Sequence, residues 1–113
     1  MKSDFPYLHH IDDAIAAIEN YVADGREVFL RERMIQDAVI RNFEIIGEAD
    51  NRLSPAVRDP ADPVWKRVIA FRNRLIHGYW SVDLLLVWGV IQKDLPGLKR
   101  EVARLLRDLG GKS

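Results

Sequence analysis

The apolar residues of this chain recur at intervals of three and four, which is the spacing of one helix face rather than of a strand. In the first such segment the stripe is formed by Leu8, Ile11, Ile15, Ile18 and Val22. Asp24-Gly25 ends that segment, and the next apolar pattern predicts a second helix over about Glu27 to Leu53. The pattern therefore favours an all-α fold.

Two further helical segments follow in the second half of the chain. Asp62-Pro63 is a capping residue followed by proline, which predicts a helix that begins there and ends at Gly78. In the last segment two apolar series step by seven residues, as in the seam of a bundle. They are Leu84, Ile91, Leu98 and Leu105, and Trp88, Leu95, Val102 and Leu109. Ser81 is expected to cap this helix, and Pro96, which has no N–H to donate, is expected to kink it.

Four such helices predict an up-and-down four-helix bundle in a single domain over residues 1–113. Ser54-Pro55 repeats the cap-and-proline signal, so a short extra helix near 55–59 is an option.

Composition narrows the function classes. The formal net charge is zero, which argues against a protein that coats nucleic acid by bulk electrostatics. The absence of cysteine excludes disulfides and thiolate metal sites and fits a reducing compartment. The longest apolar run, Leu84 to Ile91, is far shorter than the roughly 20 residues that span a bilayer. With no signal core at the N-terminus, we expect a cytoplasmic protein that does not enter membranes.

The third predicted helix carries basic residues on one face and no acid anywhere between Pro63 and Val82. On an ideal helix the polar residues within about 60° of Ala70 are Lys66, Arg67, Asn73, Arg74 and His77. A solvated surface is the ordinary interpretation of such a face. Exposed helix faces usually mix both charge signs, however, and this one does not.

Arg72 lies on the opposite, apolar arc of the same helix. A buried guanidinium stays charged, so it needs an acid or an anion beside it. One interpretation is an ion pair with Glu44 or Glu48 of the second helix. The other is an arginine held in a cleft to bind phosphate. Arg72 and His77 lie about 140° apart on an ideal helix, so both can act on one substrate only if the helix distorts or a second subunit contributes.

The segment "FRNRLIHGYW" contains Arg72, four residues, His77, one residue and Tyr79, which matches the Arg-x4-His-x-Tyr motif of the HEPN superfamily. Asn73 after the arginine fits its commonest form. Three blocks, "QDAVIRNFEIIGEA" (36–49), "VWKRVIAFRNRLIHGYW" (64–80) and "SVDLLLVWGVIQKDLPGLK" (81–99), resemble the HepT toxin family.

The resemblance implies an all-helical homodimer that acts as a metal-independent endoribonuclease. It further implies the toxin of a type VII HEPN/MNT toxin–antitoxin system, whose MntA-like minimal nucleotidyltransferase antitoxin transfers AMP to the motif tyrosine. Carried over, Arg72 and His77 are catalytic, Asn73 and Arg74 support them, and Tyr79 is the AMP acceptor. The family favours Arg72 for the phosphate, whereas helix geometry favours Arg74, which shares a face with His77.

Cleavage without a metal or cofactor requires an acid and a base, yet each chain has one motif histidine. We therefore expect an active site shared across a dimer axis and a 2′,3′-cyclic phosphate product. The alternative is a non-catalytic helical subunit of a nucleotidyltransferase that binds nucleotide or substrate. His9-His10 with Asp12-Asp13 is a poor metal site, because adjacent helical residues point about 100° apart.

Overall fold

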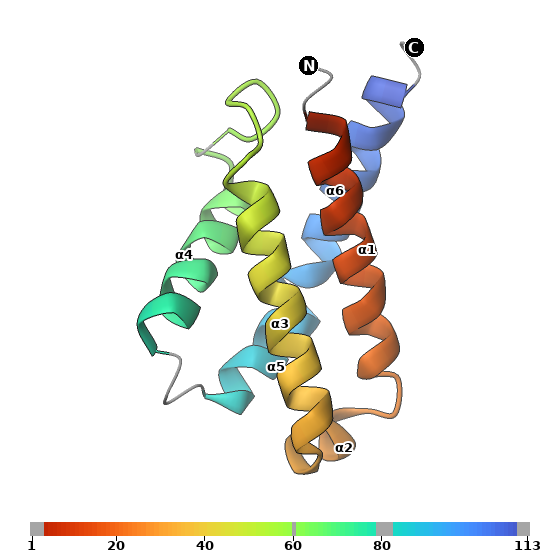
Figure 1. The fold of residues 1–113 in the computed structure, drawn as a ribbon, viewed down its shortest axis with the longest axis vertical. Coiled ribbons are helices and arrows are strands. Elements are labelled where there is room, and N and C mark those ends of the chain that lie inside the picture. The colour runs from red at the N-terminus through yellow and green to blue at the C-terminus, as the bar shows by residue number, and fades with distance from the viewer. Residues whose placement is uncertain (1–3, 60, 79–82, 111–113) are drawn as a thin grey trace.

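The computed structural model describes residues 4–59, 61–78 and 83–110, and for 76–78 it describes the backbone alone. Its elements are α1 (Phe5–Tyr21), α2 (Arg26–Arg31), α3 (Arg33–Asp50), α4 (Pro63–Gly78), α5 (Leu84–Lys93) and α6 (Leu95–Gly110). The chain runs down α1, up α3, down α4 and up through α5 and α6, so the start of α1 and the end of α6 lie at the same end of the bundle (Figure 1). The all-α, up-and-down bundle is confirmed.

The apolar stripe of the first helix forms the centre of the core. Leu8, Ile11 and Ile18 are fully buried in α1, which packs against α3 and α6. On the other side of the bundle α4 also packs against α3 and α6. The helix α3 therefore lies between α1 and α4, and its two sides meet different neighbours.

The second predicted helix is divided in two, which the sequence pattern did not indicate. Glu32 adopts an extended conformation, with φ −96° and ψ 106°, and separates α2 from α3. The turn lets Phe29 of α2 become fully buried, with its ring 5.6 Å from that of Trp88. The side chain of Gln36 crosses the break and donates a hydrogen bond to the Phe29 carbonyl at 2.9 Å. Burial of Phe29 accounts for the break.

The last predicted helix also breaks, close to the expected kink. Asp94 separates α5 from α6, and Pro96 occupies the first turn of α6, where its missing N–H is tolerated. The cap of α5 is Asp83, whose Oδ1 accepts from Leu85 N at 3.0 Å and from Leu86 N at 3.3 Å. The proposed cap Ser81 lies outside the described residues.

The segment near 55–59 forms turns rather than the optional extra helix. Val57 N and Arg58 N both donate to the Ser54 carbonyl, at 3.1 Å and 3.0 Å, and the pattern does not continue into a helix. Asp4, which is fully buried, accepts from both the backbone N and the Oγ of Ser54 at 2.7 Å. Burial raises the pKa of Asp4, but the Ser54 hydrogen bonds outweigh it and lower that pKa. The start of α1 thus fixes the loop that carries Arg58.

Among the described helices, none combines the length and apolar character needed to cross a bilayer.

Candidate functional site

The helix α4 begins where the sequence predicted. Asp62 Oδ1 accepts from Val64 N at 2.9 Å, with Pro63 as the first helical residue. Trp65 and Leu75 are buried, and Phe71 packs edge-on against Phe43 of α3 with ring centroids 4.8 Å apart. The apolar arc of α4 therefore faces the core, as expected.

Arg72 is half-buried on this arc, against α3. Its Nη1 lies 3.7 Å from Oδ2 of Asp50, and the side chains are 23% and 0% exposed. An ion pair of Arg72 with Glu44 or Glu48, one of the two interpretations left open by the sequence, does not form. Both glutamates lie 3.6 Å from Nη1 of Arg41, on a more exposed side of α3. The acid that reaches Arg72 is the one on the buried side of α3.

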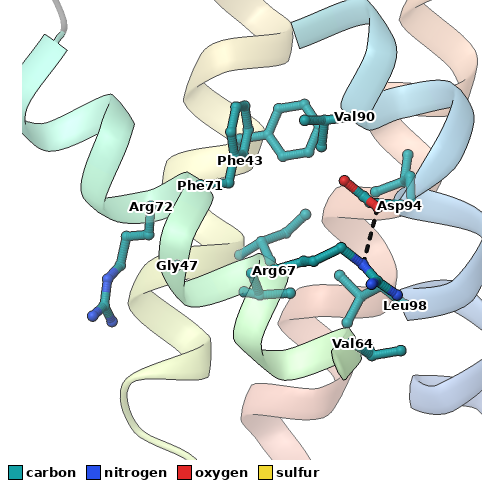
Figure 2. A pocket seen from close by; sticks show the side chains of 12 residues that line it. Phe43, Gly47, Val64, Arg67, Phe71, Arg72, Val90, Asp94 and Leu98 are labelled. Carbon is teal, nitrogen blue, oxygen red and sulfur yellow. Dashed lines mark ion pairs between the residues drawn. The ribbon is translucent and has the colours of Figure 1, made fainter. Parts of the chain in front are cut away.

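Gly47 allows this approach. A Cβ placed on Gly47 would lie 2.7 Å from Cγ and 2.9 Å from Cδ of Arg72. The stem of Arg72 therefore rests directly on the backbone of α3. Figure 2 shows Arg72 beside Gly47, with its guanidinium extended away from the apolar crevice between Phe43, Val90 and Leu98.

Asp50 is shared by two cations. Arg58 Nη1 donates to Asp50 Oδ2 at 3.4 Å, the same oxygen that faces Arg72. Asp50 Oδ1 is buried and has no hydrogen-bond partner among the described residues. Burial raises the pKa of Asp50 although Arg58 and Arg72 both act to lower it. With Asp50 ionised, one carboxylate faces two guanidinium groups, and the cluster keeps a net positive charge.

Beyond Arg72 lies an open groove of about 470 Å³ between α3 and α4. Its lining is Arg41, Glu44, Gly47, Glu48, Asn51, Arg72 and Leu75. Within the described part of the chain Arg72 donates no hydrogen bond, because its 3.7 Å contact with Asp50 is too long to be one. A guanidinium carries five N–H donors in a planar fork that fits a phosphate. The groove is therefore a candidate anion site.

The basic face of α4 is partly neutralised by Asp94, the residue between α5 and α6. Arg67 Nε lies 3.0 Å from Asp94 Oδ1, at the break between α5 and α6 (Figure 2). Asn73 and Arg74 are exposed, and Arg74 forms no ion pair with any described residue. Arg74 is thus a surface cation, whereas Arg72 is a partly buried one at the edge of a groove.

The backbone of α4 is α-helical through Gly78. A distortion near residues 75–77, one of the two ways in which Arg72 and His77 could meet, is absent from this described stretch. On a regular helix the two positions diverge by about 140°. Tyr79 lies outside the described residues, as does the side chain of His77.

Within the part of the chain that the structure describes, no three His, Cys, Asp or Glu side chains gather closely enough to hold a metal ion.

The amino-acid sequence matches a known protein family. The family model for HepT-like ribonucleases matches residues 11–105. "Putative RNase TTE0752" of Caldanaerobacter subterraneus subsp. tengcongensis is 34% identical over 95% of this chain and 97% of its own. "Probable ribonuclease HepT" of Thermococcus cleftensis is 36% identical over 92% of this chain and 96% of its own.

A longer relative from Methanocaldococcus jannaschii, "Gamma-glutamylcyclotransferase and putative RNase MJ0434", is 42% identical over 91% of this chain. This chain spans 47% of that relative's length. No solved structure gives a significant match. The family model and the relatives that align along nearly their full length agree, and the chain therefore belongs to the HepT-like ribonuclease family.

Proposed function

We propose that this protein is a cytoplasmic, metal-independent endoribonuclease that acts as a homodimer, with residues 1–113 as one helical domain. The observation that carries the proposal is Arg72, a half-buried arginine without a hydrogen bond to any described residue, at the edge of a groove. The family and the names of its relatives support RNA as the substrate. Arg72 then contacts the scissile phosphate, and Asn73 and Arg74 support binding from the exposed side of α4.

The chemistry needs no metal. A base removes the proton of the ribose 2′-hydroxyl, and the 2′-oxygen attacks phosphorus. The 5′-oxygen leaves with a proton from an acid, which produces a 2′,3′-cyclic phosphate and a free 5′-hydroxyl. Histidine performs both proton transfers near neutral pH, and arginine stabilises the phosphorane because it stays charged and binds two oxygens at once.

The regular course of α4 supports a site shared between two subunits. The helix continues to Gly78, and on ideal helix geometry positions 72 and 77 of one chain are about 140° apart around the axis. A two-fold axis beside α4 would bring a second copy of each group to the same phosphate. His77 of each subunit then supplies one of the two proton transfers.

If this assignment is right, purified protein cleaves single-stranded RNA with EDTA present. The expected products end in a 2′,3′-cyclic phosphate, which mass spectrometry distinguishes from a 3′-phosphate by the mass of one water. Protein that binds RNA or nucleotide and leaves the RNA intact would instead support the alternative, a non-catalytic nucleotide- or substrate-binding subunit of a nucleotidyltransferase. Arg72 at the groove suits that alternative too, because a guanidinium holds a nucleotide phosphate equally well.

We further propose that this protein is the toxin of a type VII HEPN/MNT system and that an MntA-like antitoxin regulates it. AMP attached to Tyr79 would set a bulky anion two residues from His77 and attract the arginines that bind RNA. We expect incubation with the cognate nucleotidyltransferase and ATP to add the mass of AMP and to abolish cleavage. Tyr79→Phe is the control. A Tyr79→Phe protein that still gains AMP and still loses activity would rule out this acceptor.

A further inference from the structure

We propose that Gly47 and Asp50 of α3 are positioning residues that hold Arg72 in its working orientation at the groove. The inference rests on the proposed function, because it takes Arg72 to be the arginine that contacts the RNA phosphate. Gly47 determines the conformation of the aliphatic part of the Arg72 side chain, and Asp50 determines the position of its guanidinium group.

The position of the stem depends on the missing side chain of Gly47. A Cβ there would be 2.7 Å from Cγ of Arg72, closer than real Cβ atoms approach, and 3.2 Å from its Cβ, which is a tight contact. These atoms lie near the Arg72 backbone, so rotation at the end of the side chain cannot relieve the clash. The Phe43–Phe71 ring contact lies one turn before Gly47 on α3 and one residue before Arg72 on α4, and it resists separation of the two helices. An added methyl group must therefore turn the stem of Arg72 into another rotamer.

The position of the guanidinium depends on Asp50. Its Oδ2 lies 3.7 Å from Arg72 Nη1, close enough for strong attraction yet too far to occupy an N–H donor. The attraction thus holds Nη1 of Arg72 close to the bundle, while the N–H donors of the guanidinium stay available to bind a ligand. Arg58 shares the same oxygen at 3.4 Å, so the single negative charge of Asp50 is divided between two cations. Arg72 is held in place without being neutralised.

This arrangement is poorly suited to stability alone. Asp50 is 0% exposed and its Oδ1 lacks a hydrogen-bond partner among the described residues, as does the buried Nε of Arg58. Buried polar atoms without hydrogen-bond partners lower the stability of the folded state. An ion pair kept for folding would be expected to complete these bonds. Incomplete satisfaction is typical of a cluster retained for a functional geometry.

The first test is Gly47→Ala, with Gly89→Ala as its matched control. Both glycines lie inside helices, but a Cβ at Gly89 meets no atom within 4 Å. We expect Gly47→Ala to lower the single-turnover cleavage rate by about 10²-fold, the loss typical of a misplacement of about 1 Å, and Gly89→Ala to cleave at the parental rate. A folded Gly47→Ala protein with the parental rate would overturn the role of Gly47.

The second test uses the nearly isosteric Asp50→Asn, alone and combined with Arg72→Ala. Alone, it should lower the cleavage rate at least about tenfold, while the affinity for an uncleavable 2′-deoxy oligonucleotide is retained or rises because an acid near the groove is gone. A merely structural role would lower rate and affinity together, and that result would overturn the proposal.

In a protein that already carries Arg72→Ala, adding either Asp50→Asn or Gly47→Ala should lower the cleavage rate by less than about a further twofold, because both residues act through Arg72. If the fold-losses of the single variants multiply in the double variants, the inference is contradicted. Arg72→Ala by itself distinguishes the proposed function of Arg72 from the proposed positioning roles of Gly47 and Asp50. If that variant cleaves RNA at the parental rate, the proposed function of Arg72 fails. If it is impaired while Gly47→Ala and Asp50→Asn are not, only the positioning roles fail.

Discussion

His77→Ala is expected to lower the rate of RNA cleavage by at least about 10²-fold, because one general acid–base group contributes about 10²–10⁴-fold and the substitution removes the histidine of both subunits. The physical reason is that water at neutral pH is a poor base for the 2′-hydroxyl and a poor acid for the 5′-oxygen. The measurement is a single-turnover assay with EDTA present, on protein whose melting temperature and helical circular dichroism match those of the parent. Parental activity in a folded His77→Ala protein would remove the acid–base mechanism.

The chain supplies a matched control for this substitution. Of its three histidines, His10 lies on the exposed side of α1, with its ring against Tyr7. His10→Ala should therefore cleave RNA at the parental rate. The pH dependence of the cleavage rate gives a second readout, because a histidine that transfers protons makes the rate depend on pH. The parent and His10→Ala should share one pH profile, and His77→Ala should lose the histidine-dependent part of it.

Much of the fold could be predicted because the spacing of apolar residues shows which face of each helix is buried. The stripe of Leu8, Ile11 and Ile18 is buried, and α4 begins at the cap-and-proline signal of Asp62-Pro63. The break at Glu32 was missed since no glycine or proline marks it. It depends on the burial of Phe29 beside Trp88, a contact between residues far apart in sequence. Local patterns do not record such contacts.

The candidate site was predictable in part. An arginine in the middle of an apolar arc was identified as unusual, and Arg72 does lie half-buried against α3. The sequence suggests Glu44 or Glu48, on the polar side of α3, as the acid that pairs with Arg72. Asp50 lies seven residues after Phe43, on the buried stripe of α3. An acid at the spacing of the apolar residues was the sequence signal that could have identified it as the partner of Arg72. The role of Gly47 depends on the distance between two helices, which sequence spacing does not give.

A mixed dimer tests whether two chains share one site. One subunit carries Arg72→Ala and the other His77→Ala, with different affinity tags so that only mixed dimers are purified. Each parent homodimer lacks every copy of one catalytic group, whereas the mixed dimer keeps one Arg72 and one His77 on different chains. Because α4 continues to Gly78, the groups that converge are expected to come from different chains. The mixed dimer keeps one copy of each group, so it should cleave faster than either parent homodimer and more slowly than the unmodified dimer, which has both histidines.

The control dimer pairs an unmodified subunit with one that carries both substitutions. It also keeps one Arg72 and one His77, but on the same chain. If α4 directs these side chains about 140° apart, the control should be the less active of the two assemblies. The opposite ranking, with the control active and the mixed dimer no better than its parents, would mean that each chain brings its own arginine and histidine together. The helix would then have to depart from the regular geometry that separates them.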